Sequence, residues 1–276
     1  MIYTDHLQVL SFITLRCNLD CAFCTSRMLP VKEHGKELSG DEWCKIIDEC
    51  PSRIQHWTFS GGEPTLHPGF VQICEKLRSI DSTMYISTNL AKNPAEWLLG
   101  SYIEKVVMLG VSLQFLPDDP RAETFWKRLD SVQFAYPDLP VELKFVVTTH
   151  TPKAVEGYVQ SLAEGRGIKY VRQVFMNMYM YRDFPPKRDM TCDCTGGKNF
   201  AVLMPDSQLY RCYGQALTGY SAKNTRVSEK GWVFPSDAEE CRYCVCMPDG
   251  ICDDVRKTNI VGSQELPKAD HKWIWK

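Results

Sequence analysis

The sequence predicts an α/β fold, in which a partial (β/α)6 TIM-like barrel is followed by a small cysteine-rich domain with a β-hairpin. Short β-rich runs alternate with amphipathic helical patterns through the first two thirds of the chain, which is typical of a parallel sheet with right-handed crossovers. After about residue 182 this helical periodicity stops, and cysteines cluster between Cys192 and Cys252. We therefore expect a barrel domain at 1–182 and a cysteine-rich domain at 183–276.

Each expected strand is a short run rich in β-branched or aromatic residues. The first, LQVLSFITL, is apolar along most of its length, as in a buried parallel strand. A cysteine cluster, GGEP, STN and SLQ lie at or near the ends of the first four strands. Because active sites of such barrels gather at the carboxyl ends of the strands, we expect these segments to meet there. The expected strands are 8–15, 55–60, 84–89, 105–115, 142–149 and 169–177.

Each expected helix carries apolar residues at helical spacing. In LSGDEWCKIIDEC, Ser39 is the expected N-cap, and Trp43, Ile46 and Ile47 form the apolar stripe. Further along, NFAVLMPDSQLYRC (199–212) reads as a β-hairpin with PDSQ as its turn. The expected helices are 38–50, 68–80, 94–103, 121–135 and 152–165.

Composition indicates an ordinary globular protein of 276 residues, with 44% hydrophobic and 24% charged residues. A formal net charge of −2 gives no indication of a nucleic-acid partner or an acidic membrane surface. The N-terminus lacks the features of a signal peptide, and no apolar run reaches membrane-spanning length, so we expect a cytoplasmic protein. In a reducing compartment, thirteen cysteines favour metal or redox chemistry over a disulfide framework.

Three cysteines, Cys17, Cys21 and Cys24, lie within RCNLDCAFC directly after the first strand. Three thiolates this close in sequence can hold three corners of one iron–sulfur cube, leaving one iron for an outside ligand. The alternative is a zinc site completed by a distant histidine, although structural zinc usually has paired C-x-x-C ligands. The triplet therefore favours a [4Fe–4S] cluster with an open iron.

This CxxxCxφC pattern, with Phe23 before the third cysteine, resembles the signature of the radical S-adenosylmethionine (radical SAM) superfamily. The resemblance extends over residues 8 to 177. It implies that the amino and carboxylate groups of S-adenosylmethionine (SAM) chelate the open iron. It further implies that an electron from the reduced cluster cleaves SAM to a 5′-deoxyadenosyl radical, which abstracts a hydrogen atom from the substrate.

The resemblance also implies cofactor-binding residues at the strand ends. GGEP resembles the family motif that holds the methionyl amino end of SAM, ISTNL resembles the third-strand TNG motif with Leu90 in place of glycine, and VSLQF resembles the fourth-strand segment. The alternative reading of these segments is turn and capping chemistry. The cofactor-binding candidates are Gly61, Gly62, Glu63, Ser87, Asn89, Ser112, Gln114, Phe23 and Gln173.

Arg172, on the last expected barrel strand, is the candidate catalytic residue, as a proton acceptor or a carboxylate anchor on the substrate side. The alternative is a surface ion pair. In the C-terminal domain, CDCTGG followed by a hairpin resembles the SPASM/Twitch extensions of radical SAM enzymes. That resemblance places Gly five residues before the second cysteine, where this chain has Ser207, so we expect a different turn type.

The SPASM/Twitch resemblance implies one auxiliary [4Fe–4S] cluster, held by a hairpin pair and a C-x-x-C pair of cysteines. A second auxiliary cluster with an open iron is the runner-up, and a zinc knuckle within 241–252 is the alternative. The expected ligands are Cys194, Cys212, Cys241 and Cys244, with Cys192, Cys246 and Cys252 as alternative ligands.

The sequence thus predicts a radical SAM oxidoreductase or isomerase that receives electrons from a flavodoxin- or ferredoxin-type donor. The first hypothesis for its substrate is a small polar molecule, such as a sugar, cyclitol or nucleoside, that undergoes oxidation or rearrangement. The alternatives are radical modification of a ribosomal peptide or protein side chain, and a non-catalytic iron–sulfur or zinc binding module.

Overall fold

The computed structural model describes residues 7–21, 24, 26, 37–52, 54–147, 151–174, 200–210, 216 and 225–226. The described strands form one sheet with the order β6-β5-β4-β3-β2-β1-β7-β8-β9. All neighbouring pairs from β6 to β7 are parallel, which confirms the predicted α/β fold of a partial TIM-like barrel. The barrel strands are β1 (Leu7–Thr14), β2 (Ile54–Gly61), β3 (Thr83–Thr88), β4 (Val106–Leu113), β5 (Val141–Val147) and β6 (Lys169–Val174).

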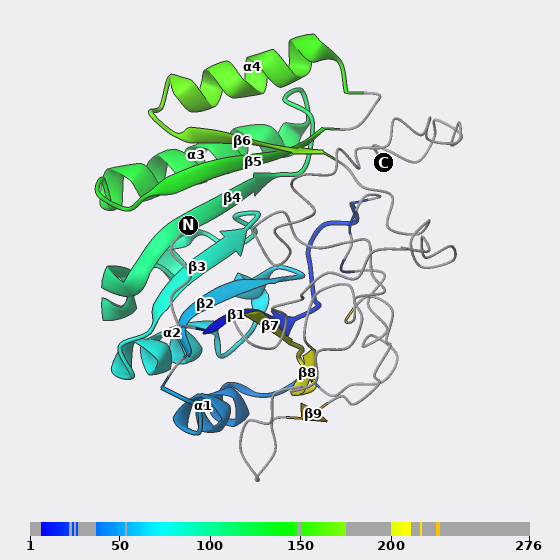
Figure 1. Ribbon diagram of the computed structural model, residues 1–276. Coiled ribbons are helices and arrows are strands. Elements are labelled where there is room, and N and C mark those ends of the chain that lie inside the picture. The colour runs from blue at the N-terminus through cyan, green and yellow to red at the C-terminus, as the bar shows by residue number, and fades with distance from the viewer. Residues whose placement is uncertain are drawn as a thin grey trace, which may run out of the picture.

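Four α-helices connect the barrel strands and follow the outer side of the curved sheet (Figure 1). The first begins at the predicted N-cap, because the Glu42 N–H donates to Ser39 Oγ at 3.2 Å while the Ser39 N–H donates to the Glu42 carboxylate at 2.7 Å. This capping box satisfies two backbone donors that would otherwise lack partners at the helix start. The helices are α1 (Gly40–Asp48), α2 (Phe70–Ser79), α3 (Pro120–Ala135) and α4 (Lys153–Glu164).

Large aromatic side chains fill the space between the sheet and the helices. Phe59 of β2 meets Phe70 of α2 edge to face at 5.8 Å between ring centroids, and Phe70 meets Trp97 in the same way at 5.7 Å. All three are at most 2% exposed. Burial of such side chains contributes about 1.5–3 kcal/mol each, so this layer fixes where the helices sit and leaves the other face of the sheet available for a site.

The prediction of a helix over 94–103 was wrong. The chain there forms two short 3₁₀ turns, Pro94–Glu96 and Ser101–Lys105, separated by Gly100 in an extended conformation. The Tyr102 hydroxyl donates to the Trp97 carbonyl, and the Tyr102 N–H donates to the Glu75 carboxylate at 3.2 Å. The Glu75 carboxylate of α2 and the Tyr102 side chain therefore use backbone groups that a continuous helix would pair internally.

The predicted hairpin is confirmed as β7 (Phe200–Leu203) and β8 (Gln208–Tyr210), and β9 (Thr225–Arg226) pairs with β8. Ser207 has φ +68°, and its N–H donates to the Met204 carbonyl at 3.0 Å. A turn closed by a residue in the left-handed region is common in three-residue hairpin loops. The expectation of a different turn type is therefore wrong, because the serine adopts the conformation that favours glycine.

The hairpin continues the sheet of the barrel, since β7 pairs in parallel with β1 from Gln8↔Phe200 to Ser11↔Leu203. The predicted domain boundary between 182 and 183 lies outside the described residues and stays a prediction. Within the described part of the chain, no helix is both long enough and apolar enough to cross a membrane.

Candidate active site

The three clustered cysteines follow the carboxyl end of β1, as the sequence predicts. Cys17 is exposed, while Cys21 and Cys24 are half-buried. The Cys24 N–H donates to the Cys21 carbonyl at 3.1 Å, and the Leu19 N–H donates to the Cys17 sulfur at 3.4 Å. The backbone thus turns tightly through the segment and directs one N–H at a candidate ligand sulfur.

The electrostatics of the three thiols suit a cationic centre. Burial raises the pKa of Cys17, and burial together with the neighbouring Cys24 and Cys17 raises the pKa of Cys21 to about 12. Because thiolates at these positions repel one another, a positively charged iron centre would favour their deprotonation. The donor set therefore fits an iron–sulfur cluster.

A one-ion zinc site is not formed by the residues that the structure describes. Among them, no three His, Cys, Asp or Glu side chains lie close enough together to hold a metal ion.

The GGEP segment is joined to the chain that leads into Cys17. The Gly62 N–H donates to the Thr14 carbonyl at 3.0 Å, and the Glu63 N–H donates to the Arg16 carbonyl at 2.8 Å. A Cβ at Gly62 would lie 2.2 Å from the Arg16 carbonyl oxygen, and Gly61 has φ +115°. The two glycines are thus required because the end of β2 approaches the end of β1 backbone to backbone.

The Glu63 side chain points inward and is 1% exposed. Its Oε1 accepts from Thr65 N at 3.1 Å, Thr65 Oγ1 at 2.7 Å and Thr88 Oγ1 at 2.8 Å, and its Oε2 accepts from Asn89 N at 2.6 Å. Burial raises the pKa of this carboxyl, although the bond from the Asn89 N–H and the other three act in the opposite direction. All four hydrogen bonds that this carboxylate accepts therefore come from within the protein.

Asn89 connects the end of β3 to the cysteines. Its side-chain Nδ2 lies 3.6 Å from the Cys17 sulfur and 3.0 Å from Asn18 Oδ1. Its Oδ1 is buried and has no hydrogen-bond partner among the described residues. The next residue, Leu90, has φ +57°, so this departure from the TNG pattern keeps the left-handed conformation that glycine prefers.

The fourth strand supplies a second buried oxygen that lacks a partner in the described part of the chain, Oε1 of Gln114. Ser112, 9% exposed, lies two residues earlier on β4, and Ser87 is half-buried on β3. A buried amide oxygen without a donor is costly unless a ligand or water supplies one. The unpartnered oxygens of Asn89 and Gln114 therefore fit a ligand that carries hydrogen-bond donors, as SAM does.

Polar side chains also line the concave face of the sheet below these residues. The Tyr85 hydroxyl of β3 donates to Glu142 Oε1 of β5 at 2.7 Å, and the Lys144 ammonium lies 4.6 Å from the centre of the Tyr85 ring. A Cβ at Gly110 of β4 would come within 1.9 Å of the Tyr85 hydroxyl, so glycine lets the tyrosine cross β4. This face suits a substrate with polar groups.

The structure pairs Arg172 with a residue of α4. Its Nε donates to Glu156 Oε1 of α4 at 2.7 Å, and α4 packs on the outer side of the sheet. This placement matches the surface ion pair that was the alternative reading. Gln173 is exposed on β6. The remaining candidates lie outside the described residues: Phe23, Cys192, Cys194, Cys212, Cys241, Cys244, Cys246 and Cys252.

Several residues that support the site were not predicted from the sequence. Arg128 of α3 donates to the carbonyls of Leu90 and Ala91, both at 2.6 Å, and so holds the left-handed turn after Asn89. Arg16 and Glu37 form an ion pair beside the cysteines. Only Arg16 had a signal in the sequence, since it directly precedes Cys17; the others depend on contacts between distant segments.

Comparison with known proteins identifies the same region. Residues 11–137 match the radical SAM superfamily. A probable GTP 3′,8-cyclase of Methanopyrus kandleri is 22% identical over 57% of this chain and 53% of its own length. The PqqA peptide cyclase of Bradyrhizobium diazoefficiens is 41% identical over 24% of this chain and 18% of its own. This chain therefore spans about half the length of the first relative and less than a fifth of the second.

A solved structure, native anSMEcpe with bound AdoMet, is similar in fold. The TM-score is 0.51 at 16% sequence identity, and the alignment covers 80% of this chain and 77% of that one.

Proposed function

Through residues 11–137 the chain belongs to the radical SAM superfamily, and from this premise we propose that it is an enzyme that modifies a side chain of a ribosomal peptide or protein. The choice of a peptide or protein substrate is based on the matches to PqqA peptide cyclases, which include 41% identity over 68 residues and 29% identity over 138 residues. They favour the peptide alternative over the sugar, cyclitol or nucleoside that the sequence suggested first.

The family uses SAM and a [4Fe–4S] cluster, and we propose Cys17, Cys21 and Cys24 as the cluster ligands. When bound, the cluster and SAM together would supply a 5′-deoxyadenosyl radical that removes a hydrogen atom from the substrate. The clustering of the thiols supports this assignment, since burial, together with the neighbouring Cys24 and Cys17, raises the pKa of Cys21 to about 12, and a cationic iron centre would favour the thiolate.

The residues at the strand ends orient the cofactor in this proposal. The Asn89 and Gln114 side-chain oxygens offer acceptors, and the backbone of Gly62 and Glu63 lies beside the chain that enters the cysteine segment. The Asn89 Nδ2 and Leu19 N–H groups point at the Cys17 sulfur. Hydrogen bonds to a ligand sulfur stabilise the thiolate and raise the reduction potential of a cluster.

We further propose one auxiliary [4Fe–4S] cluster on Cys194, Cys212, Cys241 and Cys244, with Cys192, Cys246 and Cys252 as alternative ligands. The hairpin of β7 and β8, which precedes Cys212, supports this proposal. A fully ligated auxiliary cluster serves electron transfer, which suits a net oxidation. A flavodoxin- or ferredoxin-type donor and a cytoplasmic location stay predictions from the sequence.

The test is anaerobic reconstitution with iron and sulfide, followed by dithionite and SAM. Release of 5′-deoxyadenosine supports an enzyme, and its absence from fully loaded protein supports a non-catalytic module. Synthetic peptides encoded by short reading frames beside the gene, prepared with deuterium in their side chains, test the substrate class. Transfer of deuterium into 5′-deoxyadenosine confirms a peptide substrate.

GTP is the matched small-molecule probe, because the first relative is a probable GTP 3′,8-cyclase. Deuterium transfer from ribose-deuterated GTP, with none from the peptides, would overturn the peptide proposal and leave the radical SAM chemistry in place.

A further inference from the structure

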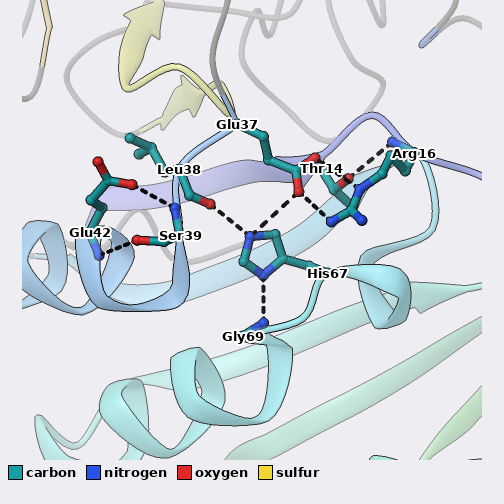
Figure 2. Close-up of polar contacts among 8 residues, drawn as sticks. All are labelled: Thr14, Arg16, Glu37, Leu38, Ser39, Glu42, His67 and Gly69. Carbon is teal, nitrogen blue, oxygen red and sulfur yellow. Dashed lines mark hydrogen bonds and ion pairs between the residues drawn. The ribbon is translucent and has the colours of Figure 1, made fainter.

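We propose that Glu37 is a positioning residue that fixes the path of the chain from Thr14 and Arg16 into Cys17. This inference rests on the proposed function, because it assumes that Cys17, Cys21 and Cys24 hold the cluster. Arg16, which directly precedes Cys17, is in direct contact with Glu37 although the two lie 21 positions apart in the sequence. Their contact is shown in Figure 2.

Glu37 holds the end of β1 through both of its oxygens. Its Oε2 accepts from Thr14 Oγ1 at 2.6 Å and from Arg16 Nε at 3.3 Å, and its Oε1 pairs with the terminal Arg16 nitrogen. The buried Thr14 hydroxyl also accepts the Arg16 N–H at 3.0 Å. The two-point contact between a carboxylate and a guanidinium sets direction as well as distance, so it defines the path of the chain into Cys17.

The backbone next to Glu37 is itself held from two sides. His67 Nε2 donates to the Leu38 carbonyl at 2.9 Å, while its Nδ1 accepts the Gly69 N–H at 3.0 Å. The Leu38 N–H donates to the Pro205 carbonyl at 3.0 Å, in the turn between β7 and β8. His67 is 1% exposed and neutral in this arrangement, with both ring nitrogens in use. Glu37 therefore projects from a fixed support and not from a free loop.

Two further contacts hold the chain near the cysteines. Ser26 Oγ donates to the Gly61 carbonyl at 2.5 Å, and Asn89 Nδ2 reaches the Cys17 sulfur. These contacts hold Ser26 and Cys17, whereas Glu37 holds Thr14 and Arg16, the residues that lead into Cys17. Loss of the Glu37 contacts would remove the two-point restraint on Arg16 and so change the direction in which the chain enters Cys17.

An ordinary surface ion pair is the competing interpretation, because the Arg16 side chain is 54% exposed and that of Glu37 is 28% exposed. Such pairs contribute little to folding stability. The two interpretations differ in what they affect: a surface pair changes nothing at the cluster, while a positioning residue changes how well the cluster is held.

The experiment compares wild-type protein with E37Q and with the matched control E104Q, all reconstituted anaerobically as full chains. Glu104 forms an exposed pair with Arg78 at 3.0 Å, outside the cysteine site. The readouts are the rate of iron loss to an Fe(II) chelator, the thermal midpoint of the metal-free protein, and the KM and kcat for SAM cleavage.

We expect E37Q to lose iron about 10-fold faster than wild type, in the range found when residues that orient metal ligands are changed. Its KM for SAM should rise, and the metal-free midpoint should match that of E104Q. Iron loss and KM equal to those of E104Q would overturn the inference. Should E37Q not fold, R16K carries the test: lysine keeps the charge but not the two-point geometry, and iron loss no faster than in E104Q would overturn it.

The experiment distinguishes failure of the proposed function from failure of the role assigned to Glu37. If wild-type protein itself binds no cluster at the three cysteines, the proposed function fails. If wild type binds it and E37Q holds it equally well, only the role of Glu37 fails.

Discussion

Replacement of Glu63 by glutamine tests whether the GGEP carboxylate is structural. Oε1 of Glu63 accepts three hydrogen bonds, from Thr65 N, Thr65 Oγ1 and Thr88 Oγ1, so the amide oxygen of E63Q should take that position. The amide nitrogen must then occupy the place of Oε2, where the Asn89 N–H approaches to 2.6 Å. Two donors would face each other in a site that is 1% exposed.

The magnitude follows from these contacts. Loss of one hydrogen bond to a charged acceptor costs about 1.5–3 kcal/mol, and a buried donor left without an acceptor costs about 1–3 kcal/mol. Glutamine also removes the burial of an ionised carboxylate, the effect that raises the pKa of Glu63, and this offsets part of the loss. We therefore expect E63Q to lower the free energy of unfolding by about 2 kcal/mol at pH 7.

The assay is urea unfolding of metal-free protein, followed by tryptophan fluorescence, with E104Q as the control for an exposed glutamate. The control should stay within about 0.5 kcal/mol of wild type. In reconstituted protein, E63Q should also raise the KM for SAM, because Asn89 loses the acceptor that holds it beside Cys17. Unfolding of E63Q within the error of E104Q would refute the reasoning, since it would mean that the hydrogen bond from the Asn89 N–H to the carboxylate contributes nothing.

The other predictions concern backbone conformation and titration. G62A should be destabilised by about 3 kcal/mol or fail to yield soluble protein, because the new Cβ would meet a backbone carbonyl oxygen at 2.2 Å. G157A, on α4 with nothing within 4 Å of the added Cβ, should instead be stabilised by about 0.5–1 kcal/mol. Equal effects of the two variants in a thermal melt would contradict this expectation. S207G should be stabilised by about 1 kcal/mol in the same measurement, since glycine adopts φ +68° without the steric cost that serine bears. A lower thermal midpoint than that of wild type would contradict the assigned turn. Burial lowers the pKa of His67 below 6.5, so the unfolded chain binds the proton more tightly and wild-type stability should fall as pH drops below about 6.5. H67Q should reduce the dependence of unfolding free energy on pH, measured by urea titrations between pH 5.5 and 8. Burial also lowers the pKa of His56, but this residue contributes equally to both proteins. An unchanged pH dependence would contradict the assignment of His67 as buried and neutral.

Local patterns predicted most elements of the barrel, because each depends on periodicity and on residues close in sequence. All six barrel strands and the helices α1 to α4 lie within a few residues of their expected positions. The failure at 94–103 has a tertiary cause. Glu75 of α2 accepts the Tyr102 N–H, which a helix would need, and no pattern within the segment reveals that partner. The Tyr102 hydroxyl in turn uses the Trp97 carbonyl.

The candidate site divides in the same way. The triplet Cys17, Cys21 and Cys24 and the GGEP segment were recognisable because their spacing is itself the signal. The sequence could not show that the Glu63 carboxylate is consumed by internal hydrogen bonds, since its donors come from three separate positions and two elements. It also left two roles open for Arg172, and the structure pairs that side chain with Glu156.

The sequence by itself determined the order of the barrel strands and of the helices α1 to α4, the end of the sheet at which polar segments gather, and the match of residues 11–137 to the radical SAM superfamily. These depend on short-range spacing, which every chain with this sequence carries whether or not it is folded. Only the tertiary structure decided that Glu37 meets Arg16, that Asn89 reaches Cys17 and that β7 joins β1. Such contacts connect residues tens to hundreds of positions apart, so they exist only once packing of the core has brought the strand ends together.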